Sequence, residues 1–267
     1  MYTYEEFWNN LREIKKEYLP RYDSYLTDAN RSSAIFPVYK QTDISTHLIF
    51  LAYWLKKHGN QVVARLIFRS PEGANIDREY VPLLDYRPVE LNVSDAFGVS
   101  EVGFVGSVEV EVYSRSQPRF PYPAITLMYT GENGSSVVHS GIRFYNHDEN
   151  PSDYVIYHPQ TGFDIIPRNG YKNFICFFGG NKENYEFKIY ILENGHCEEK
   201  SLNLINPHHG KMHIIYLEDV FGKEVVRSFN KPKVDIVHCL DDIFPRFYVG
   251  SESKQFVPTL THTFFDT

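Results

Sequence analysis

The chain has few cysteines and lacks long apolar runs and the common nucleotide-binding and hydrolase motifs. Its cysteines, Cys176, Cys197 and Cys239, are odd in number and have no CxxC spacing, so we expect neither a disulfide framework nor a zinc site. No apolar run approaches the roughly 20 residues that cross a bilayer, so we expect no membrane span. The first residues lack the basic start and apolar core of a signal peptide, and we therefore expect a cytoplasmic protein.

The charge balance is acidic, with 34 Asp and Glu against 27 Lys and Arg and a formal net charge of −7. Nucleic-acid binding draws on clustered Lys and Arg, so we expect no nucleic-acid partner. GxGxxG, Walker, GxSxG and HExxH motifs are absent, which leaves dinucleotide, nucleotide, α/β-hydrolase and zincin chemistry without their local requirements. The histidine-containing stretches at residues 147–149 and 208–209 place neighbouring side chains on opposite faces of a strand, so we expect no metal site and no cofactor.

Aromatic residues are abundant, at 16 % of the chain with 20 Tyr and 20 Phe. Such residues favour strands, where large flat side chains pack on a pleated surface. Val108, Val110 and Val112 alternate with Glu109 and Glu111, which is the period-two pattern of a half-buried antiparallel strand. We therefore predict a mainly β fold whose exposed strand faces carry acidic side chains.

A degraded internal repeat divides the chain into two copies. Residues 89–146 are matched by residues 213–266, and within them Asp-Ala-Phe-Gly at 95–98 aligns with Asp-Val-Phe-Gly at 219–222, an offset of 124 residues. A period this long indicates tandem domains rather than a solenoid, whose repeats run roughly 20–50 residues. We predict two tandem antiparallel β-sandwich domains from internal duplication, at residues 36–150 and 151–267, each with about seven strands. Asp95 and Asp219 are then expected in Asx-type turns where a strand ends.

The apolar run at residues 47–55 fits either a buried strand or a short helix. Its counterpart at residues 173–178 ends in a Gly-Gly pair and is too short for a helix, so we predict a buried strand in both copies. A polar turn follows each run, at residues 56–60 and 180–184, and leads into a further strand, which predicts a hairpin.

The N-terminal residues predict one amphipathic helix before the first copy. Thr3 and Glu6 have capping-box spacing, and Pro20 ends the helix. The apolar side chains on its buried face are Phe7, Leu11, Ile14 and Tyr18. We expect this helix to cover an open face of the first β domain or to form a homo-oligomer, with residues 1–35 making up the helix and a connector.

Each copy has the same order of elements: a strand, a polar turn, a strand, a short turn, a strand that ends in the Asp-containing reversal, and an extended strand. This layout resembles the small β-sandwich of sensory-rhodopsin-transducer-like proteins. The resemblance implies a non-enzymatic, oligomerising sandwich that binds a small molecule or a sugar. It rests on layout alone, so it assigns no functional residue.

Polar side chains recur beside aromatic ones near the end of both copies. The candidate ligand-binding residues are Arg119, His139, Tyr145 and Asn146 in the first copy, and Arg246, Tyr248, His262 and Asp266 in the second. Guanidinium, imidazole and aromatic groups at strand ends suit the recognition of sugars or carboxylates. A His before Ser or Thr on a terminal strand also serves simply to bond a backbone carbonyl at a sheet edge, and this alternative stays open.

These patterns favour a non-catalytic binding or assembly module for a glycan or a small metabolite. The alternative is a sugar isomerase or lyase-like enzyme in which His139 or His262 is the general base and Tyr145 or Tyr248 is the acid. We favour binding because the sequence places no orienting partner beside either histidine at a recognisable spacing.

Replacing Arg119 or Arg246 with Ala tests the predicted site. If the site binds an anionic sugar, each variant loses a charge-assisted contact and about 1.5–3 kcal/mol of binding free energy, with little change in melting temperature. Titration with an anionic sugar and thermal melting measure these two effects. If both variants melt several degrees lower and keep their affinity, the arginines hold the sheet edge instead.

Overall fold

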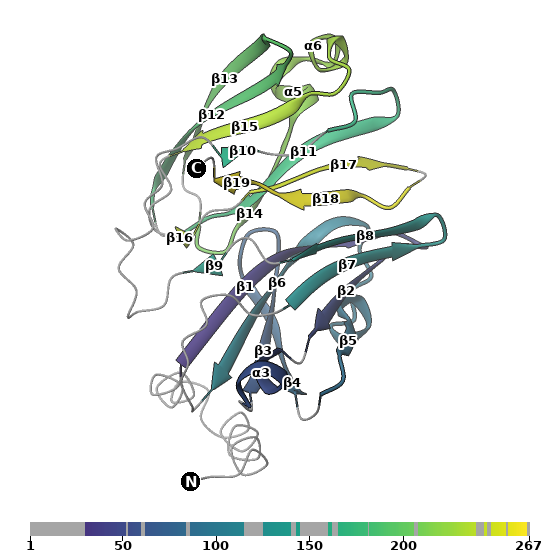
Figure 1. Ribbon diagram of the computed structural model, residues 1–267, viewed down its shortest axis with the longest axis vertical. Helices are drawn as coiled ribbons and strands as arrows, with labels where there is room; N and C mark the ends of the chain where they lie inside the picture. Colours follow the sequence, from purple (N-terminus) through teal and green to yellow (C-terminus); the bar gives the residue numbers. More distant parts are fainter. Residues whose placement is uncertain are drawn as a thin grey trace.

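In the computed structural model, the described residues are 30–51, 53–59, 62–83, 86–114, 125–139, 143–144, 160–161, 165–180, 182–205, 208–238, 243–244, 247–254 and 256–265. The expected N-terminal helix lies outside these residues. Most of the described chain lies in antiparallel strands, which confirms the mainly β fold (Figure 1). Among the described residues, no helix has the length and apolar character needed to cross a membrane.

The first half of the chain forms two four-stranded antiparallel sheets. One has the order β1-β6-β3-β4, with β1 at Asn30–Lys40, β6 at Gly103–Ser114, β3 at Val62–Arg69 and β4 at Asn75–Leu83. The other has the order β5-β2-β7-β8, with β5 at Val89–Asn92, β2 at Ser45–Phe50, β7 at Ile125–Gly131 and β8 at Gly134–His139. Two short helices, α3 (Tyr53–His58) and α4 (Val93–Ala96), follow β2 and β5.

The second half also forms two large sheets. One has the order β13-β12-β15-β10-β19, with β13 at His196–Ile205, β12 at Asn184–Glu193, β15 at Lys233–His238, β10 at Gln160–Thr161 and β19 at Phe264–Phe265. The other has the order β14-β11-β17-β18, with β14 at Met212–Tyr216, β11 at Tyr171–Phe178, β17 at Tyr248–Ser253 and β18 at Thr259–His262. Helices α5 (Leu217–Phe221) and α6 (Lys223–Ser228) follow β14. A short ladder between β9 (Arg143–Phe144) and β16 (Ile243–Phe244) pairs one half with the other.

Strands pair in the same order in the two halves. Read across the sheets, β1-β6-β3-β4 corresponds to β10-β15-β12-β13, next to which the second half adds β19 at the edge. The order β5-β2-β7-β8 corresponds to β14-β11-β17-β18. Side chains connect the two sheets of each half: the Tyr129 hydroxyl of β7 donates to the Pro37 carbonyl of β1 at 2.9 Å, and Phe177 of β11 packs on Phe187 of β12 with ring centroids 4.9 Å apart. These contacts are those of a β-sandwich.

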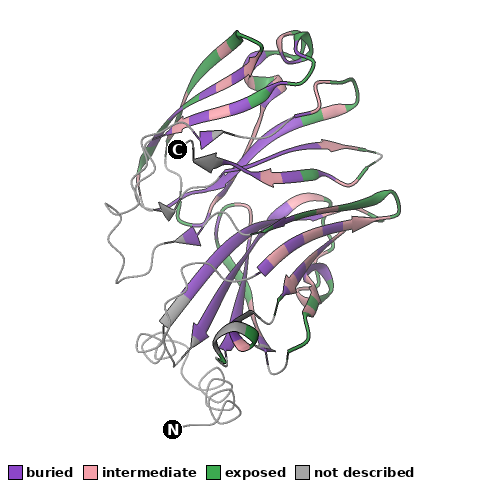
Figure 2. Cartoon of the chain, in the orientation of Figure 1, coloured by how far each residue is buried: buried purple, intermediate pink, exposed green. Residues whose placement is uncertain are grey.

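The sheet of β1, β6, β3 and β4 is buried on both faces of its central strands (Figure 2). All eight residues of β3 are buried, and Glu109 and Glu111 of β6 are only 2 % and 4 % exposed. The expectation that these glutamates face solvent is wrong. Period-two alternation tells which residues share a face, whereas the tertiary structure decides whether that face is covered.

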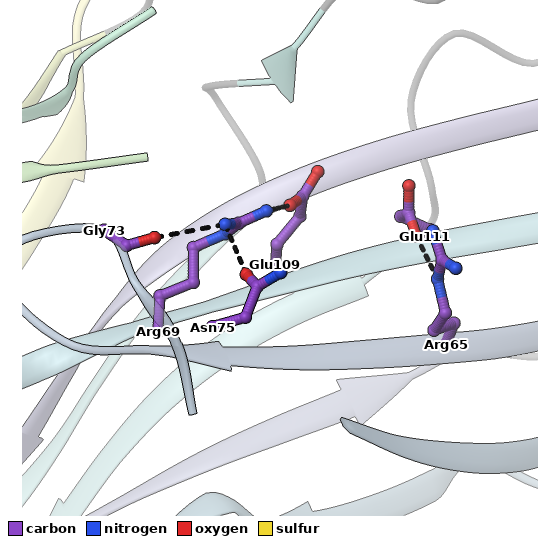
Figure 3. Close-up of polar contacts among 6 residues, drawn as sticks. All are labelled: Arg65, Arg69, Gly73, Asn75, Glu109 and Glu111. Atoms are coloured by element: carbon purple, nitrogen blue, oxygen red, sulfur yellow. Dashed lines mark hydrogen bonds and ion pairs between the residues drawn. The ribbon is translucent and has the colours of Figure 1, made fainter. Parts of the chain in front are cut away.

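Arg65 and Arg69 of β3 neutralise these carboxylates from the neighbouring strand (Figure 3). Arg69 Nη2 donates to Glu109 Oε2 at 2.5 Å, and its Nη1 donates to Asn75 Oδ1 at 2.5 Å. Arg65 donates to Glu111 through Nε and forms an ion pair with it through Nη2. Charges are tolerated inside a protein only when they are paired and hydrogen-bonded, which accounts for the pairing of each buried glutamate with an arginine.

Two further segments differ from the expectation. Residues 30–35, expected in a connector, belong to β1; their polar composition suggested a loop, but Ser32 and Ser33 are 0 % and 1 % exposed within the sheet. The apolar run at 47–55 is a strand only as far as Phe50, and α3 begins at Tyr53. The helix therefore occupies residues that were expected to finish the strand and form the turn.

The reversals that contain Asp95 and Asp219 are short helices rather than Asx-type turns. Asn92 caps α4, because its side-chain oxygen accepts from the Ser94 amide at 3.0 Å and from the Asp95 amide at 3.4 Å. Asp95 and Asp219 lie in the first turns of α4 and α5, where a negative charge interacts favourably with free backbone N–H groups. In the first copy the capping side chain is thus Asn92, which precedes the expected aspartate.

Removing the charge of Glu109 tests the buried ion pair. The Glu109→Gln change keeps the side-chain volume but leaves the Arg69 guanidinium buried without a counter-charge, so we expect the free energy of unfolding to fall by about 3 kcal/mol. Urea unfolding measures this change. The control is Glu199→Gln, because Lys188 and Glu199 form an exposed pair, with 54 % and 46 % of the side chains accessible, and such pairs contribute little. Equal unfolding midpoints for the two variants would contradict the role of the buried pair.

Candidate functional site

The two histidines predicted as site residues lie against each other between the halves. β8 and β18 are neighbours in space (Figure 1), and His139 Nε2 is 2.7 Å from His262 Nε2. The Thr263 carbonyl accepts from His262 Nδ1 at 2.9 Å, so in the neutral pair His262 Nε2 is the acceptor and His139 Nε2 the donor. The sequence suggested one site per copy, whereas these histidines make a single contact across the halves. In the described part of the chain, no group of three or more His, Cys, Asp or Glu is placed to hold a metal ion.

Tyr248 is the third predicted site residue that the structure describes. It lies opposite His262 on the neighbouring strand, is 0 % exposed, and donates its hydroxyl to the Ile35 carbonyl at 2.8 Å. This hydroxyl therefore links the two halves from the interior. The other predicted residues lie outside the described part of the chain: Arg119, Tyr145, Asn146, Arg246 and Asp266. A ligand-binding role for the whole set stays a prediction.

A buried polar network continues from the histidine pair into the second half. Thr263 Oγ1 donates to Gln160 Oε1 at 2.5 Å, and Gln160 Nε2 donates to His238 Nε2 at 2.7 Å. Burial lowers the pKa of His238 to about 4, so the ring is neutral at pH 7 and accepts this bond. Each polar group thus has a partner in the interior, which supports a structural role for this network.

A cleft of about 740 Å³ opens between the two halves. The first half contributes the end of β1 and the start of β6, and the second half contributes the start of β11 and the ends of β14 and β17, together with α5 and α6. Its aromatic lining residues are Tyr39, Phe104, Tyr171 and Tyr216. Its charged lining residues are Lys172, Glu218, Asp219, Lys223, Arg227, Glu252 and Lys254. The volume lies within the roughly 300–1,000 Å³ of small-molecule sites.

Phe104 ties the first half to the second beside this cleft. Its ring centroid lies 4.9 Å from that of Tyr39 in its own half and 5.0 Å from that of Phe174 in the other, both in edge-to-face geometry. Edge-to-face pairs are favourable because the positive ring edge meets the negative face. The aromatic contact therefore holds the two walls of the cleft in a defined relation.

Two tyrosine hydroxyls in the cleft are held as neutral hydrogen-bonding groups. Burial, with the Glu252 carboxylate nearby, raises the pKa of Tyr39 to about 12. Burial and a hydrogen bond to Glu252 raise the pKa of Tyr216 well above its ordinary value. The Tyr216 hydroxyl donates to Glu252 Oε1 at 2.7 Å, and Gln41 Nε2 donates to the Tyr39 hydroxyl. At neutral pH both phenols are protonated, so neither is available as a general base.

Lys172 and Glu218 also have defined positions in the cleft. Lys172 Nζ lies 4.8 Å from the ring centroid of Tyr216, within the range of a cation–π interaction. Glu218 accepts from the Asn173 backbone amide at 2.9 Å and from Asn173 Nδ2 at 2.6 Å. The hydrogen bonds between Glu218 and Asn173 connect the start of α5 to β11, and they fix the position of one wall of the cleft.

Sequence reasoning missed this cleft because its residues come from several separate segments and share no motif. One signal was present in the repeat: Glu218 stands where the first copy has Ser94, so the two copies differ at the entrance to the reversal. That difference alone did not show which other residues lie nearby.

No family model and no curated protein matches the chain. Among solved structures, it is similar to Bacteroides uniformis beta-glucuronidase 2 covalently bound to cyclophellitol-6-carboxylate aziridine, with 9 % identity and a TM-score of 0.19, over 87 % of this chain and 25 % of that one. It is similar to a beta-glucuronidase from glycoside hydrolase family 2 with 9 % identity and a TM-score of 0.19, over 86 % of this chain and 23 % of that one. The chain spans about a quarter of the length of these proteins. Likeness at this level carries no argument about fold or function.

Acid should destabilise the protein through His238. Its pKa of about 4 in the folded chain lies below the value of about 6.5 in an unfolded chain, so the stabilisation is complete above pH 6.5 and is lost as the pH falls towards 4. Between pH 7 and pH 5 we expect a loss on the order of 1–2 kcal/mol from this group. Urea unfolding at the two pH values measures it, with His238→Asn as the comparison. An equal loss in both proteins would show that other groups cause the pH dependence.

Proposed function

We propose that the chain is a non-catalytic binding module that holds a hydroxyl-rich small molecule, such as a sugar or a related metabolite, in the cleft between its halves. The observation that carries this proposal is the presence in one cleft of aromatic rings together with hydroxyl, amide and charged groups. Sugar rings present apolar C–H faces and many hydroxyl groups, so they require both flat apolar surfaces and hydrogen-bond partners.

The positions of the cleft side chains support binding of this kind. Tyr171 is half-buried at the start of β11 and lines the cleft. Gln41 and Glu252 are held by the Tyr39 and Tyr216 hydroxyls, so their remaining donors and acceptors have defined directions. Groups that are oriented before the ligand arrives lose less entropy when it binds.

The same contacts favour binding over catalysis. General acid–base catalysis works best when the catalytic group has a pKa near the working pH. The pKa values of Tyr39 and Tyr216 are raised away from neutrality, and Glu218 is held by hydrogen bonds from Asn173. These groups are suited to orienting a ligand rather than to moving its protons.

We infer that residues 36–150 and 151–267 are two sandwich domains that arose by internal duplication. The shared order of strand pairing in the two halves supports this inference. On this view, the cleft is a consequence of pairing the copies, because both contribute to its lining. The N-terminal helix is proposed to cover the first domain or to join two copies of the chain.

Replacing Tyr171 with Ala should weaken the binding of a sugar in the cleft. A panel of neutral, acidic and amino sugars is screened by thermal shift, and the strongest binder is then titrated calorimetrically. Loss of the ring should cost about 1 kcal/mol of binding free energy, or about fivefold in Kd. The control is Tyr86→Ala, because Tyr86 is 60 % exposed and does not line the cleft. A panel without a binder, or equal affinity in the Tyr171 variant, counts against the proposal.

A further inference from the structure

We infer that the cleft selects ligands that carry an anionic group, a carboxylate or a phosphate, on their hydroxyl-rich body; this inference rests on the proposed function. The cleft differs in charge from the chain as a whole, which has 34 acidic and 27 basic side chains. The basic lining residues are Lys172, Lys223, Arg227 and Lys254, and the acidic ones are Glu218, Asp219 and Glu252. An acidic protein thus gathers an excess of basic groups around one cleft.

The carboxylates of Glu218 and Glu252 already have protein partners. Glu218 accepts three hydrogen bonds from Asn173 at 2.6–3.2 Å, counting both of its oxygens, and Glu252 accepts the Tyr216 hydroxyl at 2.7 Å. These hydrogen bonds occupy acceptor positions on both carboxylates and fix their orientation, so fewer of their oxygen lone pairs face a ligand. Of the acidic lining residues, Asp219 is the one that stays exposed to solvent.

The basic groups, by contrast, remain open to a ligand. Within the described part of the chain, no carboxylate forms an ion pair with Lys172, Lys223 or Lys254. Lys172 Nζ lies 4.8 Å from the centroid of the Tyr216 ring, and this contact leaves its positive charge without a carboxylate partner among the described residues. Arg227 reaches Glu224 only at 3.5 Å, and 92 % of the Glu224 side chain is accessible to solvent, so this contact holds the guanidinium weakly.

Lys223 and Arg227 are placed to act together. They lie four residues apart on α6, so their side chains project from the same face of the helix, and both line the cleft. Like charges on one face repel each other, and a bound anion removes this repulsion. A guanidinium donates two parallel hydrogen bonds to a carboxylate or a phosphate, while the ammonium adds a second cationic donor. The geometry therefore favours an anionic ligand over a neutral or cationic one.

The test compares sugars that differ in charge. The intact chain is titrated at low salt with glucuronate, glucose 6-phosphate, glucose and glucosamine. We expect at least one of the two anionic sugars to bind about tenfold or more tightly than glucose, and glucosamine to bind most weakly. The double variant Lys223→Gln with Arg227→Gln should lose this preference. The charge-matched control, Lys200→Gln with Lys233→Gln, changes exposed lysines outside the cleft and should keep it.

The outcomes separate this inference from the proposed function. Equal affinity for glucose and both anions overturns the anionic preference and leaves sugar binding intact. An anionic preference that survives in the Lys223 and Arg227 variant also overturns it, because the anion is then bound elsewhere. If none of the four sugars binds, the proposed function fails together with the inference. The order of glucuronate and glucose 6-phosphate distinguishes a carboxylate ligand from a phosphate ligand.

Discussion

The contact between the two halves is the constraint on which the rest of the structure depends. In the interior, the Tyr248 hydroxyl donates to the Ile35 carbonyl at 2.8 Å. Nearer the surface, the Met212 amide at the start of β14 donates to the carbonyl of Pro71, in the turn between β3 and β4, at 2.8 Å. The approach is close: a Cβ at Gly73 would lie 2.6 Å from a backbone oxygen of the second half. Because both halves line the cleft, its shape exists only while this contact is kept.

Charge is used in opposite ways at two places in the molecule. In the first sheet, Arg65 and Arg69 are paired with glutamates on the next strand, so that burial leaves no charge uncompensated (Figure 3). In the cleft, Lys223 and Arg227 lie exposed on α6 without a strong partner. Buried charges require such partners, whereas weakly held cations at the surface remain available to a ligand.

Part of the candidate site could be anticipated and part could not. The recurrence of His139 and His262 singled out two residues whose Nε2 atoms lie 2.7 Å apart in the structure. The repeat itself indicated two separate sites, one in each half. Two copies of a pattern reveal equivalent positions, but they do not reveal how the copies pack against each other. The cleft residues Tyr39, Tyr171 and Glu252 come from separate strands and share no spacing, so their proximity depends on that packing.

The sequence by itself determined the mainly β character, because aromatic richness and period-two alternation suit pleated strands and depend only on neighbours along the chain. Only the tertiary structure decided which strand faces are buried, because burial depends on the segments that pack against each face. Glu109 and Glu111 alternate with valines as solvent-facing residues would, yet they are buried because the face they share is covered and arginines stand beside them. Alternation along a strand shows which residues share a face of the sheet. Whether that face lies in the core, in a cleft or in solvent depends on contacts between segments far apart in the sequence.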